Sequence, residues 1–68
     1  MLRLREIRER KGVSLRALKK MSGVAVSSLA RFEAGKGDPQ LSTLRKLAKA
    51  LNVTVAELIG EWSPKKGD

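Results

Sequence analysis

Residues 14–36 decide the fold, and they read SLRALKKMSGVAVSSLARFEAGK. Leu15 and Leu18 lie three residues apart, a spacing that places both on one face of a helix. Ser14 precedes them, and its hydroxyl is a common cap for the free amides of a helix N-terminus. Gly23 adopts the left-handed conformation easily and therefore ends a helix. We expect a helix that starts after Ser14 and ends just before Gly23.

A second helix is expected directly after this turn, over residues 25–34, with Leu29 and Phe32 facing inward. Glycine and proline residues in 35–39 close it. Two short helices joined by a glycine-containing turn form a helix-turn-helix, whose second helix lies in the DNA major groove. Helical bundles of other kinds also use short glycine turns. The pattern thus indicates DNA binding without requiring it.

Helical periodicity continues on both sides of this unit. A helix over residues 2–11 places Leu4 and Ile7 inward and ends at Gly12. A helix over residues 41–51 has the strongest apolar stripe of the chain, formed by Leu41, Leu44, Leu47, Ala48 and Leu51.

The last predicted helix begins at Thr54. Glu57 follows three residues later, which is the spacing of a capping box, and Gly60 closes the helix. No stretch alternates long enough to predict a strand. We therefore predict an all-α fold, a compact five-helix bundle over residues 1–60, followed by a short flexible tail over residues 61–68.

The composition excludes several classes of protein. The 68 residues contain no cysteine and no histidine, so a disulfide framework, a thiolate metal site and a histidine base are all excluded. Neither a nucleophile elbow nor a phosphate-binding glycine loop is present. We expect no enzyme activity, no metal and no cofactor. Without a signal peptide or an apolar membrane span, we expect a cytoplasmic protein that does not contact a membrane.

Positive charge is concentrated in the first half of the chain. The net charge is +8, and residues 1–36 hold ten lysines and arginines against three acids. Residues 37–68 hold five against four. One basic side suits a polyanion, because lysine and arginine replace the counterions of a phosphate backbone. A solvated basic surface is the alternative.

Between Leu4 and Ile59 the sequence resembles the lambda repressor and Cro-like helix-turn-helix family, also called XRE-type. The resemblance rests on several motifs in the family's order: Leu4 to Arg8, Gly12 to Ser14, Gly23-Val24, Leu29 to Lys36, Pro39, and Leu44 to Val53. It implies a five-helix domain that binds double-stranded DNA and regulates transcription, most often as a repressor. It also implies a homodimer on a partly palindromic operator.

Carried over by position, the resemblance implies base contacts from the predicted second helix of the motif, by Ala25, Val26, Ser27, Ser28 and Arg31. Arg31 is the one strong donor fork among them, and guanine presents the two matching acceptors. Arg31 bound to a phosphate is the alternative. This helix lacks the glutamine or asparagine with which many relatives read adenine, so DNA shape would have to contribute to recognition.

Phosphate contacts are expected from a second set of residues, namely Leu15 through its backbone amide, Arg16, Lys20, Lys36, and the backbone amides of Leu41 and Ser42. Many relatives have glutamine at the position of Leu15 and alanine at that of Lys19. A lysine there must extend its stem outward from the helix pair, and either the two helices cross at a slightly wider distance or Lys19 reaches a phosphate.

The resemblance further implies an ion pair between Arg8 and Glu33, which would hold the recognition helix against the first helix; two solvated charges are the alternative. Leu58, Ile59 and Trp62 are candidates for a dimer contact, or else they cover the core. As an alternative function, an antitoxin-like or adaptor module would bind a protein through the same three residues and bind DNA only weakly.

Overall fold

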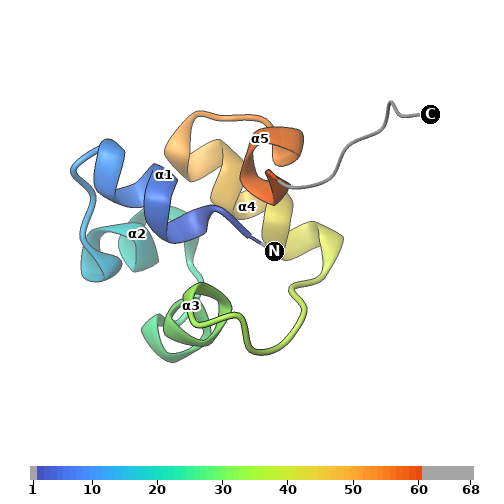
Figure 1. The fold of residues 1–68 in the computed structure, drawn as a ribbon. Helices are drawn as coiled ribbons and strands as arrows, with labels where there is room; N and C mark the ends of the chain where they lie inside the picture. Colours follow the sequence, from blue (N-terminus) through green and yellow to red (C-terminus); the bar gives the residue numbers. More distant parts are fainter. Residues whose placement is uncertain (1, 61–68) are drawn as a thin grey trace.

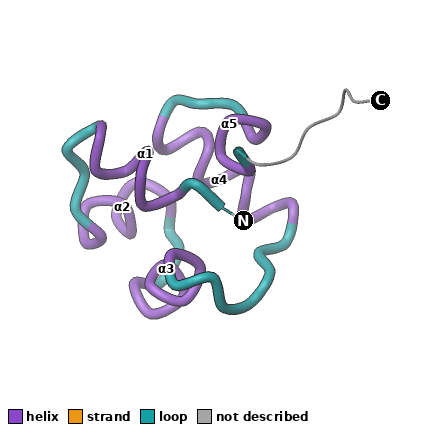
Figure 2. Tube along the Cα trace, in the orientation of Figure 1, coloured by secondary structure: helices purple, strands orange, loops and turns teal. Residues whose placement is uncertain are grey.

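The computed structural model describes residues 2–60. Within them are five helices and no strand, as Figures 1 and 2 show. The helices are α1 (Leu4–Arg10), α2 (Leu15–Ser22), α3 (Val26–Glu33), α4 (Leu41–Leu51) and α5 (Val55–Ile59). The predicted all-α helix-turn-helix fold is confirmed.

All five helices contribute to one hydrophobic core. The side chains that are almost fully excluded from solvent are Leu4, Ile7, Leu18, Leu29, Leu47, Ala48, Leu51 and Leu58. Each large aliphatic side chain buried in this way contributes about 1.5–3 kcal/mol. The core therefore fixes how the short helices are oriented, since none of them is long enough to be stable alone.

The predicted apolar stripe of α4 is wrong at its first residue. Leu41 is 56% exposed, whereas Leu44 is half-buried and Leu47 is fully buried. Burial thus begins only after the first turn of α4, because α2 and α5 cover the later turns.

The helix ends follow the capping residues closely. The Ser14 hydroxyl accepts a hydrogen bond of 3.0 Å from the amide of Ala17, and no capping box forms on α2. Thr54 and Glu57 form the predicted capping box on α5. The first helix begins at Leu4 and not at residue 2: Arg3 is its N-cap, with non-helical φ −98° and ψ 28°, and the Arg3 amide donates to the carbonyl of Leu58.

The turn between α2 and α3 is held by its own hydrogen bonds. Gly23 has φ +79°, the left-handed conformation expected of it. The Ser22 hydroxyl donates to the Leu18 carbonyl at 2.7 Å and accepts from the Val24 amide at 3.2 Å. This serine therefore fixes the angle at which α3 leaves α2.

The third helix is slightly shorter than predicted. Ala25 and Ala34 are its caps and not helical residues, and alanine offers no side-chain oxygen to the free amides of α3. In Figure 1 this helix (green) lies at the bottom of the view, below α1 and α2, which both contact it. One side of α3 is consequently open to solvent.

Candidate nucleic-acid interface

The outer side of α3 presents the residues that the sequence assigned to base contacts. Ala25, Ser27 and Arg31 are exposed, and Val26 and Ser28 are half-buried. Leu29, between them in sequence, is fully buried and anchors the helix in the core. Four of the five predicted base-contact residues therefore lie at the N-terminus of α3, and Arg31 follows Ser27 by one turn, so that these two exposed side chains share a face of the helix.

Arg31 lies along the loop that follows its own helix. A Cβ atom placed on Gly37 would be 3.6 Å from Nη2 of Arg31, so the guanidinium lies beside this glycine. The amide of Lys36 donates a 2.9 Å hydrogen bond to the Arg31 carbonyl. No ion pair within residues 2–60 involves Arg31 or Lys36, so both cations remain available to an anion.

A second basic area lies on α2. Arg16, Lys19 and Lys20 are all exposed and together line a surface hollow of about 320 Å³. There is no acidic residue in the first turn of this helix, and none elsewhere along it. Lys19 thus extends outward, as its stem requires, and joins the two predicted phosphate contacts on one side of α2.

The N-terminus of α2 adds backbone donors to this area. Ser14 satisfies the amide of Ala17, but no hydrogen bond within residues 2–60 uses the amides of Leu15 or Arg16. Free amides of a first turn carry partial positive charge, which attracts a phosphate. Leu15 itself is half-buried against the core, so only its backbone is free to make a contact.

An ion pair joins α1 to α3 just behind this surface. Nε of Arg8 donates to Oε2 of Glu33 at 2.7 Å, and Nη2 donates to Oε1 at 3.2 Å. The two side chains are only 12% and 9% exposed. The hydrogen bond that Arg8 donates to Glu33 raises the pKa of the Arg8 guanidinium, which stays charged at any ordinary pH.

The same guanidinium also reaches the loop between α1 and α2. Nη1 of Arg8 donates to the carbonyl of Val13 at 2.8 Å. The sequence did not predict this acceptor, because every residue has a backbone carbonyl and the residue pattern does not indicate which one a side chain will reach. One arginine therefore holds α1, the start of α2 and the end of α3 together.

The remaining predicted phosphate contacts lie farther along the chain. Lys36 is exposed in the loop after α3, and Leu41 and Ser42 are the exposed first residues of α4. Gln40 is the N-cap of α4 and makes no side-chain cap, so the first amides of α4 are also free.

The candidate dimer contacts are not a single exposed patch. Leu58 is fully buried, so of its two alternatives, a dimer contact or a place in the core, the structure supports the second. Ile59 is half-buried, and Trp62 lies outside the described residues, as does the whole predicted tail over residues 61–68.

The described residues form neither a metal site nor a membrane span. Their side chains include no cluster of acidic residues able to hold a metal ion. None of their helices is long and apolar enough to cross a membrane.

Comparison with known proteins agrees with this geometry. A family model described as helix-turn-helix matches residues 4–58. The HTH-type transcriptional regulator PuuR of Escherichia coli is 38% identical over 97% of this chain and 35% of its own length. AnsR of Bacillus subtilis, another HTH-type transcriptional regulator, is 36% identical over 94% of this chain and 55% of its own length.

A phage protein is also similar. The cryptic phage CTXphi transcriptional repressor RstR of Vibrio cholerae is 37% identical over 60% of this chain and 37% of its own length. The chain spans about a third to a half of the length of these relatives.

The fold and the basic surface define a helix-turn-helix DNA-binding domain. The chain belongs to the helix-turn-helix family of the Cro/C1 or XRE type, and the relatives named here are transcriptional regulators.

Proposed function

We propose that the chain recognises specific double-stranded DNA sequences and regulates transcription as a repressor. The exposed side of α3 carries the proposal, because Arg31, Ser27 and Val26 are free to enter a major groove. Arg16, Lys19 and Lys20 on α2 and Lys36 in the loop after α3 are exposed cations, which suits contacts with the phosphate backbone.

The mechanism divides into positioning and reading. Arg16, Lys20, Lys36 and the free amides of α2 and α4 fix the register on the backbone. Arg31 reads guanine once its side chain turns from Gly37 toward the groove, and alanine and valine contact thymine methyl groups. Because so few side chains carry base information, the shape of the DNA supplies part of the specificity.

The Arg8–Glu33 pair has a structural role in this proposal. It lies behind the surface and fixes the end of α3, so that base-reading side chains approach the groove at one angle. The guanidinium matches both carboxylate oxygens, which gives the contact a defined geometry.

We further propose a homodimer that forms on DNA, with the two copies on half-sites of an inverted repeat. Ile59, at the end of α5, is the described residue that remains a candidate contact, and Trp62, the other candidate, lies outside the described residues. The action would be cytoplasmic, as the regulators that it resembles are bacterial or phage proteins acting on DNA.

The alternative function, an antitoxin-like or adaptor module, loses part of its support. Its expected docking patch included Leu58, which is buried in the core. Among the described residues, the large apolar side chains that are most exposed are Met21 and Leu41, on two different helices. They do not form the predicted patch.

Selection from a random duplex pool at about physiological salt tests the proposal, because electrostatic binding alone enriches no sequence. We expect an enriched inverted repeat with half-sites about 10 base pairs apart. An enriched single half-site would retain sequence reading and remove the dimer. Binding without enrichment, or no binding, would contradict sequence-specific regulation.

A further inference from the structure

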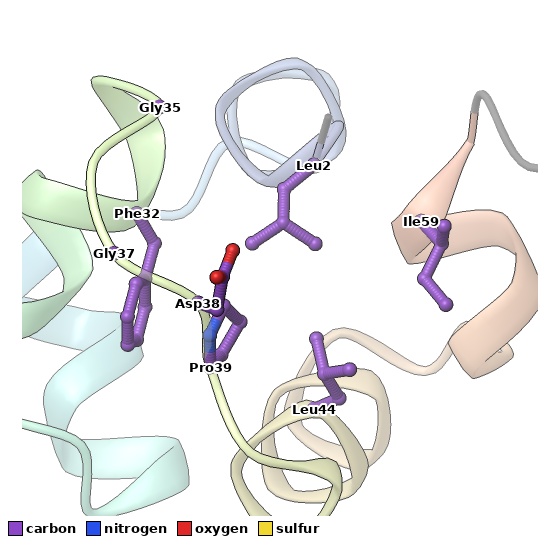
Figure 3. Close-up of a pocket in the computed structure, with 8 residues that line it drawn as sticks. All are labelled: Leu2, Phe32, Gly35, Gly37, Asp38, Pro39, Leu44 and Ile59. Carbon is purple, nitrogen blue, oxygen red and sulfur yellow. The ribbon is translucent and has the colours of Figure 1, made fainter.

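An apolar hollow lies on the side of the molecule where the two ends of the described chain meet. It is lined by Leu2, Phe32, Pro39, Leu44 and Ile59, with Asp38 beside them, and its volume is about 320 Å³. Figure 3 shows the side chains of Leu2, Leu44 and Ile59 directed toward a common space. All five apolar residues are only half-buried, so their surfaces lack a covering group within residues 2–60.

The hollow has a single acidic group. The Asp38 carboxylate lies between Phe32 and Leu2 in Figure 3, and no hydrogen bond or ion pair within residues 2–60 involves it. A large apolar side chain with one N–H donor matches such a site, because an indole has an apolar body and one polar edge. The size lies near the lower end for ligand pockets, about 300–1,000 Å³, and suits one side chain.

The chain supplies such a side chain next to the hollow. Trp62 is the only tryptophan of the protein and follows Ile59 by three residues. Three extended residues span roughly 10 Å at most, so the tether keeps the indole close to the wall that Ile59 forms. No other large apolar side chain occurs in residues 61–68.

We propose that the indole of Trp62 of the same chain occupies this hollow, with its N–H donating to the Asp38 carboxylate. The contact would join the segment after α5 to Phe32 at the end of α3 and to the loop that carries Lys36. The residues that follow the five helices would thereby brace the last turn of the recognition helix. The inference does not depend on DNA binding.

Tryptophan fluorescence of the complete chain tests the proposal directly, because one fluorophore reports one site. We expect a blue-shifted emission maximum and an acrylamide quenching constant severalfold below that of N-acetyltryptophanamide. Both values should stay unchanged when the protein is diluted through the concentration range in which sedimentation shows any dimer.

Three variants locate the indole. Leu2→Ser should shift the emission to the red and raise quenching, and Asp38→Ala should do so to a smaller degree. Met21→Ser is the matched control, since Met21 is 51% exposed on α2 and does not line the hollow. Circular dichroism establishes whether each variant is folded. If Leu2→Ser does not fold, the quenching constant of the wild-type protein alone decides whether Trp62 is covered.

Two outcomes would overturn the proposal. A quenching constant equal to that of the free amide would show an exposed Trp62. Protection that disappears on dilution together with a dimer would show that a second copy's tryptophan fills the hollow. If the selection experiment enriches no DNA sequence but Trp62 is protected from quenching, the proposed function is wrong and the place of Trp62 in the hollow still holds.

Discussion

The backbone amide of Arg3 donates a 2.8 Å hydrogen bond to the carbonyl of Leu58, which ties the residue before α1 to the last helix. The side chain of Arg3 then extends along Gly60, and its guanidinium pairs with Glu6 at 2.7 Å. Both ends of the five-helix domain therefore depend on one another, although they are more than fifty residues apart in sequence.

Gly60→Ala should test this junction. Gly60 has φ +68°, and a Cβ atom there would meet the stem of Arg3. We expect a loss of about 1–3 kcal/mol in the free energy of unfolding from backbone strain alone, because φ +68° with ψ −51° is a conformation that residues other than glycine rarely adopt. Gly12→Ala is a matched control, since its φ is +69° with no atom within 4 Å of the added Cβ. In urea unfolding, Gly60→Ala should lower the free energy of unfolding more than Gly12→Ala does. Adding Arg3→Ala to Gly60→Ala should recover much of this difference. Equal losses at both glycines would contradict the contact.

Arg8→Ala should destabilise the domain by about 2–4 kcal/mol, because it leaves the Glu33 carboxylate unpaired in a site that is only 9% exposed. Arg5→Ala removes an arginine that pairs with Glu9 at 3.1 Å, but those side chains are 70% and 56% exposed. The control should therefore lose no more than about 0.5 kcal/mol. Thermal unfolding followed by circular dichroism compares the two. Similar losses would show that the buried pair adds nothing beyond an exposed one.

Acid should weaken the cap of α5. The backbone amide and the hydroxyl of Thr54 bond to the Glu57 carboxylate and lower its pKa below the ordinary 4.5. A lowered pKa in the folded state means that this stabilisation is present above the unfolded pKa. It is lost as the pH falls through the folded value.

Glu57→Gln isolates that contribution, since glutamine also closes a capping box but does not titrate. We expect wild type to have the higher Tm near neutral pH and the difference to shrink as the pH falls below about 4. Melting curves between about pH 3 and 7 measure it. A Tm difference that is constant over this range would exclude a role for the ionised carboxylate.

Arg31→Ala and Lys36→Ala should affect DNA binding differently. Loss of Arg31 should relax discrimination at one base position by about 1–3 kcal/mol. Loss of Lys36 should weaken all sequences alike and reduce the slope of log affinity against log salt by about 0.9. Binding to the selected site and to single-base variants at several salt concentrations separates these effects. If Arg31→Ala weakens every sequence equally, Arg31 contacts phosphate.

Lys19→Ala should leave the Tm nearly unchanged, because the side chain is exposed, and should reduce the salt slope by about 0.9 through a lost phosphate contact. Lys49→Ala on α4 removes an exposed lysine that does not line the α2 hollow, and serves as the control. If both variants keep the wild-type slope, Lys19 is a solvated side chain.

The five helices, the caps at Ser14, Gly23 and Thr54 and the family could be predicted from the amino-acid sequence alone, whereas the ends of α1 and α3 were displaced by one or two residues. Ser14, Gly23, Thr54 and Glu57 act through backbone groups within three or four residues, so their effects are local and can be read from the pattern. The same holds for most of the core, because leucines at helical spacing must share a face.

Tertiary structure decided what depends on residues far apart in sequence. The burial of Leu58, the exposure of Leu41 and the hydrogen bond from Arg8 to the Val13 carbonyl all depend on which helix covers which turn. The hollow between Leu2, Phe32 and Ile59 likewise exists only because three distant segments meet. Hydrophobic periodicity states which face of a helix is buried, but only packing against its neighbours determines how much of that face is covered.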